Sequence, residues 1–239
     1  MKLPELQHQI YTVQLFSQKE PVKFRPFLVR EHKLMLQAAE AKDPKTTIST
    51  IKQIIQNCLI DEINVDALPL IDLELLFINL RARSIGEVTD LYFICKNEVN
   101  DIECGMTLQV PINLLEIPVV NKNIEKKILF SEKVGVMMKY PSIEVINKLI
   151  ETQNLTDKEF VVVINSIDYI FDETSIYKAK EATQEELLLF VEKLPQEKYD
   201  LMKTFLENSP RAKLTIEKEC VKCGYLHKIN LEGLEQFFI

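Results

Sequence analysis

Two pairs of cysteines constrain this chain more than any other feature. Two residues separate Cys220 from Cys223, eight separate Cys95 from Cys104, and a glycine follows the second cysteine of each pair. Strand-like segments flank both pairs, so each pair is expected at the tip of a β-hairpin, where glycine lets backbone amides face the sulfurs. Two such tips facing each other would place four thiolates in a tetrahedron. The sequence therefore predicts a split, zinc-ribbon-like site with one structural Zn²⁺ per chain, bound by Cys95, Cys104, Cys220 and Cys223.

Two other states of these cysteines stay open at this point, namely thiols without a metal and disulfide bonds. The first eight residues are polar and lack the apolar segment of a signal peptide, so we expect the chain to be made in a reducing cytoplasm. That compartment favours metal binding over disulfides. His227 could replace one cysteine as a ligand, whereas Cys58, on the apolar stripe of a predicted helix, is expected to be a buried structural cysteine.

The charge pattern narrows the choice of partners. The 239-residue chain has a net charge of -7, and its Lys and Arg residues form no run longer than two. Binding to nucleic acid depends on neutralising many phosphates, so nucleic acid is not an expected partner. The longest apolar stretches, such as residues 160–164, are too short to cross a bilayer, so no membrane partner is expected either.

Periodicity and capping residues predict a mixture of helices and antiparallel strand pairs. Asp43 followed by Pro44 marks the start of one helix particularly clearly. The predicted helices cover residues 30–42, 44–58, about 69–83 and 196–207, with three more beginning near residues 142, 156 and 183. The predicted strand pairs are 11–16 with 22–29, 87–95 with 106–112, 127–130 with 135–140, and 211–219 with 226–231.

These elements predict an α+β fold with an N-terminal β-hairpin and helices, a helical C-terminal half, and a split zinc-ribbon-like β module. The expected domains are an N-terminal hairpin and helical region over 1–84, the cysteine module formed by 85–120 together with 208–239, and a mainly helical region over 121–207.

No pattern of catalytic residues is found, so we expect the protein not to be an enzyme. The three histidines, His8, His32 and His227, do not stand in the motifs of zinc proteases or zinc deaminases. Asp72 and Glu74 are two residues apart on a predicted helix, so they point to different faces. They are interpreted as part of a solvated or salt-bridged helix surface rather than as an acid–base pair.

The chain ends on an apolar segment, Leu231 to Ile239, in which the last three residues are Phe237, Phe238 and Ile239. Such an end needs to be buried. It either folds back on the chain's own cysteine module or docks into a neighbouring subunit, and the sequence leaves both interpretations open.

Four segments resemble the baseplate hub proteins of T-even-type tailed phages. They are the stretch from Val22 to Leu36, the stretch from Ile51 to Cys58, the stretch from Leu68 to Glu87, and Cys220-x-x-Cys223-Gly224 with the following Ile229-x-Leu-x-Gly-Leu-x-x-Phe-Phe238. The resemblance implies a late, structural or assembly-promoting baseplate hub protein without enzymatic activity. Its implied partners are other phage baseplate or hub proteins, and its implied locations are the host cytoplasm during assembly and the tail baseplate of the virion. The alternative is an intracellular zinc-ribbon adaptor of an unrelated pathway.

Overall fold

The computed structural model describes residues 6–41 and 43–233, and it divides the chain into two compact units. Unit 1 combines the described parts of residues 1–65, 71–119 and 211–239, and unit 2 combines residues 66–70 with 120–210. Each unit is therefore assembled from segments that lie far apart in the sequence. The last six residues lie outside the described residues, so the two interpretations of the apolar C-terminal end remain predictions.

Unit 1 begins with the predicted hairpin and helices. Strand β1 (Tyr11–Val13) pairs antiparallel with β2 (Val22–Phe24). Helices α1 (Val29–Ala41) and α2 (Pro44–Cys58) follow, and α2 starts where the Asp43 carboxylate accepts a hydrogen bond from the N–H of Thr46. The next long helix, α3 (Leu70–Ile85), is apolar on most of its surface, and its side chains form much of the core.

The burial of α3 corrects one expectation from the sequence. Asp72 and Glu74 do point to different faces, but both are buried rather than solvated. The Asp72 carboxylate accepts hydrogen bonds from the N–H groups of Phe16 and Ser17, and that of Glu74 accepts one from Ala212. Both carboxylates therefore join α3 to distant segments of the chain.

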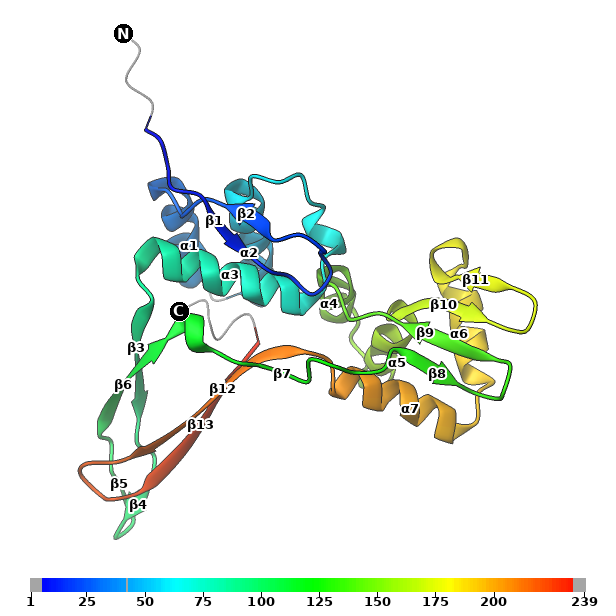
Figure 1. Cartoon of the computed structure of the whole chain (residues 1–239). Helices are drawn as coiled ribbons and strands as arrows, with labels where there is room; N and C mark the ends of the chain where they lie inside the picture. Colours follow the sequence, from blue (N-terminus) through cyan, green and yellow to red (C-terminus); the bar gives the residue numbers. More distant parts are fainter. Residues whose placement is uncertain (1–5, 42, 234–239) are drawn as a thin grey trace. The chain divides into compact units, whose positions relative to one another are not determined.

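Two antiparallel ribbons of unit 1 carry Cys95, Cys104, Cys220 and Cys223 (Figure 1). Strand β3 (Val88–Ile94) pairs with β6 (Thr107–Asn113), and β12 (Arg211–Glu219) pairs with β13 (Leu226–Glu232). Short β7 (Val119–Val120) lies beside β12. Between β3 and β6 the chain forms a small hairpin of β4 (Glu98–Val99) and β5 (Ile102–Glu103). One apolar cluster joins α3 to both ribbons through side chains that include Ile78, Ala82, Val110, Ile112 and Ala212.

Unit 2 contains helices and a four-stranded antiparallel sheet in the order β11-β10-β9-β8. The strands are β8 (Lys127–Leu129), β9 (Gly135–Met138), β10 (Ile167–Phe171) and β11 (Ile176–Lys178). The helices are α4 (Ile143–Glu151), α5 (Leu155–Asn165), α6 (Gln184–Glu192) and α7 (Gln196–Glu207). Thr183 and Glu186 form the predicted capping box at the start of α6.

The interpretation of the C-terminal half as helical was incomplete, because it missed β10 and β11. A close approach fixes this sheet at Gly135, where a Cβ atom would collide with the carbonyl oxygen of Ile128 and the ring of Phe171.

Whether the three regions expected from the sequence fold as separate domains stays a prediction. Among the described residues, no helix has the length and apolar character needed to cross a bilayer.

Candidate metal centre

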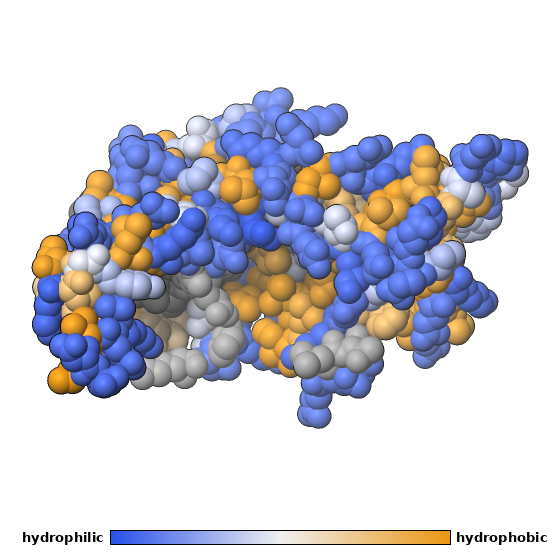
Figure 2. Space-filling model, turned by 90° about the horizontal axis from the view of Figure 1, so that it is seen from below, coloured by the Kyte–Doolittle hydropathy of each residue, from blue (hydrophilic) through white to orange (hydrophobic). Residues whose placement is uncertain are grey.

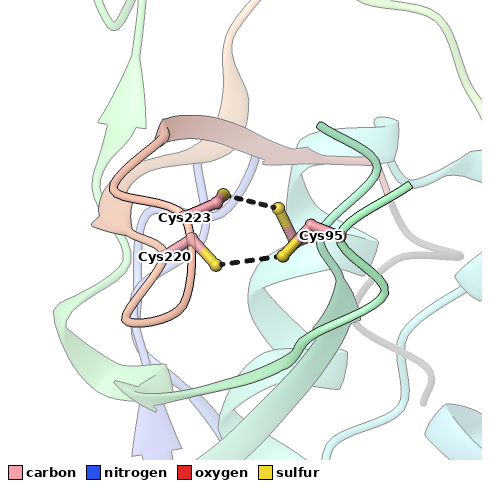
Figure 3. A group of neighbouring side chains, drawn as sticks. Cys95, Cys220 and Cys223 are labelled. Carbon is pink, nitrogen blue, oxygen red and sulfur yellow. Dashed lines mark hydrogen bonds between the residues drawn. The ribbon is translucent and has the colours of Figure 1, made fainter. Parts of the chain in front are cut away.

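The structure brings all four predicted cysteines together within unit 1. The Sγ atoms of Cys95 and Cys223 are 3.7 Å apart, and those of Cys104 and Cys220 are 3.8 Å apart. All four sulfurs lie within 4.8 Å of one another. Figure 3 shows the sulfurs of Cys220 and Cys223 pointing from the β12–β13 turn toward the sulfurs on the β3–β6 ribbon. The arrangement therefore joins the two ribbons at one point.

The two hairpin tips share one backbone framework. In the first tip the N–H of Cys95 donates to the carbonyl of Met106, and the N–H of Gly105 donates to the carbonyl of Cys95. In the second tip the N–H of Cys220 donates to Tyr225 and that of Gly224 donates to Cys220, which are the same relative positions. Gly105 and Gly224 have matching φ angles of 65° and 71°, in the left-handed region that favours glycine. The Cys-Gly pattern thus specifies the same local structure twice.

The spacing of the sulfurs fits a four-coordinate metal ion. A tetrahedral site with metal–sulfur bonds of ~2.3 Å has sulfur–sulfur edges of about 3.8 Å. Both short sulfur–sulfur distances in this protein match that edge, and they are far longer than the ~2.05 Å of a disulfide bond. All five cysteines are free, and a set of four thiolates leaves no coordination position for water.

The surroundings of the sulfurs raise the pKa of Cys95 and lower the pKa of Cys220. Burial raises the pKa of Cys95 to about 12, reinforced by the neighbouring sulfurs. Burial also opposes ionisation of Cys220, but hydrogen bonds from the backbone N–H groups of Cys223 and Lys222 and contacts with sulfurs outweigh it and lower the pKa of that thiol to about 7. Four crowded sulfurs therefore share protons unevenly, and a bound cation would let all four ionise.

Three polar side chains support the sulfurs from outside. The Nε2 atom of His227 lies 3.1 Å from the Sγ of Cys95, and its ring packs edge-on against Phe93 and Tyr225. The Asn97 side-chain amide approaches the Sγ of Cys223 at 3.7 Å, and the Lys222 ammonium donates to the carbonyl of Cys104 at 2.6 Å. These groups place positive charge and hydrogen-bond donors around the sulfurs.

Sequence reasoning considered His227 as a replacement ligand, but it missed Asn97 and Lys222. Both stand within two residues of a cysteine, which is the signal that could have drawn attention to them.

The remaining candidate residues lie away from this centre. Cys58 is fully buried at the end of α2, as expected, and burial raises its pKa to about 12. Its Sγ lies 3.5 Å from Arg25 Nη1, in a buried network with Glu31. His8 and His32 are exposed. Among the described residues, the four cysteines are the group of metal-binding side chains that the structure gathers.

Comparison with known proteins assigns the family. The model of the family described as T4 bacteriophage base plate protein matches residues 8–239. The searches of curated proteins and of solved structures found no match. The match confirms the baseplate part of the resemblance, whereas the narrower assignment to the hub is a proposal. Because the matched region spans nearly the whole chain, this protein belongs to the T4 bacteriophage base plate protein family and has a structural role in the phage baseplate.

Proposed function

We propose that this chain is a structural or assembly protein of the baseplate hub that acts by binding other baseplate proteins. In this proposal, one structural Zn²⁺ per chain is bound by Cys95, Cys104, Cys220 and Cys223. The observation that carries it is the cluster of four sulfurs, which joins two ribbons from distant parts of a chain that belongs to a baseplate family. The protein is made in the host cytoplasm, as a late protein, and enters the virion with the tail.

Zinc is the favoured ion because of the donor set and its setting. Four thiolates in a tetrahedron are typical of structural zinc and of some iron–sulfur sites. A site that only cross-links two ribbons needs no redox chemistry, and zinc supplies none. The closed coordination sphere also supports a non-catalytic role, because a catalytic zinc keeps a position for water.

The metal would contribute to the fold of unit 1. A two-stranded ribbon is marginally stable by itself. The β3–β6 and β12–β13 ribbons share an apolar cluster near α3, but at their far ends the buried side chains are mainly Leu108 and the cysteines themselves. A metal ion there would replace the apolar core that this end lacks, and it would keep 85–120 together with 208–233 as one module.

The metal part of the proposal is tested by elemental analysis of freshly purified, reduced protein. We expect one zinc per chain in the wild type and in the Cys58→Ala variant, and no zinc in the Cys220→Ser variant. Iron at one per chain, or protein free of metal, would contradict it.

The hub part is tested separately, by quantitative mass spectrometry of baseplates and of hub subassemblies purified from infected cells. Enrichment in the hub fraction supports the proposal. A chain found only in the outer parts of the baseplate contradicts the hub assignment and leaves the family membership intact. The alternative function, an intracellular zinc-ribbon adaptor of an unrelated pathway, loses its support, since the match to the baseplate family covers nearly the whole chain.

A further inference from the structure

The two hairpin tips differ in one respect that the metal site does not explain. They share their backbone hydrogen bonds and their glycine conformations, yet eight residues lie between Cys95 and Cys104 and only two between Cys220 and Cys223. The additional residues, 98–103, form the β4–β5 hairpin, which we call the finger. The N–H of Cys104 donates to the carbonyl of Asn97 at 2.8 Å and closes the base of the finger. Asn100 and Asp101, with positive φ angles, form its turn.

The finger leaves much of its apolar surface exposed. Its apolar side chains, Val99 and Ile102, are 46% and 72% exposed. Ordering a residue costs backbone entropy, and burial of apolar side chains normally offsets that cost. The second tip shows that the site needs only two residues between its cysteines. The geometry of the four sulfurs therefore does not explain residues 98–103.

The charged side chains of the finger indicate the kind of partner surface that it fits. Glu98, Asp101 and Glu103 are all exposed, and none of them forms an ion pair with another described residue. A groove of about 460 Å³ runs between the finger and the second tip, lined by Val99, Ile102, Glu103, Cys104, Lys222 and Cys223. Figure 2 shows hydrophobic residues exposed among hydrophilic ones on the left, where Figure 1 draws this end of the ribbons. The finger thus combines two apolar anchors with a rim of carboxylates, and Lys222 lies across the groove with its ammonium bonded to the carbonyl of Cys104.

We propose that the finger inserts into an apolar pocket with a basic rim on another protein of the baseplate. The inference rests on the proposed function for its setting and adds the surface and the chemistry of the partner. Carboxylates around apolar anchors select Lys and Arg around the complementary pocket. A second copy of this chain, with a net charge of -7, is a poor match for an acidic finger, and so is nucleic acid. The sulfur cluster holds the base of the finger, so little conformational freedom is lost on binding.

Deletion of residues 98–103 tests the proposal without dismantling the metal site. The deletion joins Asn97 to Cys104 and leaves Cys-Lys-Asn-Cys-Gly, the spacing of Cys220 to Gly224. The variant is supplied in trans to a phage that lacks its own copy, and its amount in purified baseplates is compared with that of the wild-type chain. We expect unchanged metal content and thermal midpoint, and about tenfold or greater loss from baseplates, as for removal of interface anchors.

Two further variants keep the chain length and decide the matter if the deletion alters metal binding. Val99→Ser with Ile102→Ser removes the anchors, and Glu98→Lys with Asp101→Lys and Glu103→Lys reverses the rim. The matched control is Glu62→Lys with Glu125→Lys and Glu132→Lys, which changes the net charge equally at exposed positions elsewhere. Both finger variants should fail to enter baseplates, and the control should enter normally.

Normal incorporation of the deletion variant, or of both substitution variants, overturns the inference while the proposed function stands. Absence of the wild-type chain from baseplates and hub subassemblies overturns the proposed function itself. A photo-crosslinking residue at position 102 adds the partner's identity. Its cross-links should fall on a peptide of another baseplate protein beside Lys or Arg, and cross-links solely to copies of this chain contradict the proposal.

Discussion

His227 Nε2 lies 3.1 Å from Cys95 Sγ, so a strand residue of β13 contacts a sulfur at the end of β3. The ring is held edge-on between Phe93 and Tyr225, which fixes its orientation toward the sulfur. If the four cysteines bind the proposed metal, an imidazole protonated at Nε2 would donate a hydrogen bond to the Cys95 thiolate. We therefore predict that His227 is a supporting residue rather than a ligand.

Replacing His227 with Phe should weaken metal binding without changing its stoichiometry. Loss of a hydrogen bond to a metal ligand typically lowers metal affinity by about 10- to 100-fold. The measurement is competition with a chromophoric chelator, together with the absorption spectrum of the cobalt-substituted protein, which reports four sulfur ligands. If the wild-type spectrum instead shows a mixed set of sulfur and nitrogen ligands, and the spectrum of the variant does not, His227 is a ligand.

Replacing Cys220 or Cys223 with Ser should abolish metal binding and loosen both ribbons, because the site and the surrounding fold form together. Hydrogen exchange should increase at β12–β13 and also at β3–β6, whose Cys95 precedes Cys223 by 128 residues. The matched variant is Cys58→Ala, in which a fully buried thiol distant from the cluster is removed. It should cost on the order of 1 kcal/mol of unfolding free energy and leave the metal content unchanged. Protection at β3–β6 that survives loss of the metal would contradict this prediction.

The cluster of four cysteines was predictable from the sequence because its information is local. Each Cys-Gly tip specifies its own backbone hydrogen bonds, and four equivalent sulfurs offer few other arrangements. The position of His227 beside Cys95 was less accessible, since it depends on how β13 lies relative to β3.

The buried acids of α3 were not predictable for a related reason. Asp72 and Glu74 bind backbone N–H groups of Phe16, Ser17 and Ala212, and any residue type can supply a backbone N–H. A charged side chain on a helix was therefore assigned to the surface. Strand β10 was missed because it follows α5 after a single residue, Ser166, without a glycine or proline to mark the boundary.

Removing Arg25 should destabilise the N-terminal part of unit 1 strongly. Its guanidinium bonds the fully buried carboxylate of Glu31 and the carbonyls of Pro26 and Asn57. Arg25→Ala leaves the buried Glu31 carboxylate with the N–H of Leu28 and the exposed Arg30 as its partners. Breaking a buried ion pair typically costs about 3–5 kcal/mol of unfolding free energy.

Urea unfolding measures this cost, and Arg30→Ala is the matched control. Arg30 also bonds Glu31, but its side chain is 65% exposed, so its loss should cost less than about 1 kcal/mol. Replacing both partners, as Arg25→Met with Glu31→Leu, should recover much of the stability lost in Arg25→Ala. Equal losses in Arg25→Ala and Arg30→Ala would mean that the buried pair has no special role.

Glu74 should make the stability of unit 1 depend on pH in the unusual direction for a carboxylate. Burial raises its pKa to about 7, although the N–H of Ala212 and the charge of Arg211 oppose the shift and the charge of Glu232 adds to it. Between its ordinary pKa of 4.5 and about 7, the folded chain keeps a proton that the unfolded chain has lost. The stabilisation is thus complete below pH 4.5, falls as the pH rises to about 7, and amounts to roughly 3 kcal/mol at most.

Glu74→Gln keeps an acceptor for Ala212 but cannot ionise. We expect the unfolding free energy of the wild type to fall relative to that of Glu74→Gln between pH 5 and pH 8, and the comparison cancels the titration of the cysteines, which both proteins share. Glu62→Gln, at an exposed carboxylate, should run parallel to the wild type. A wild-type curve parallel to that of Glu74→Gln would show that Glu74 keeps an ordinary pKa despite its burial.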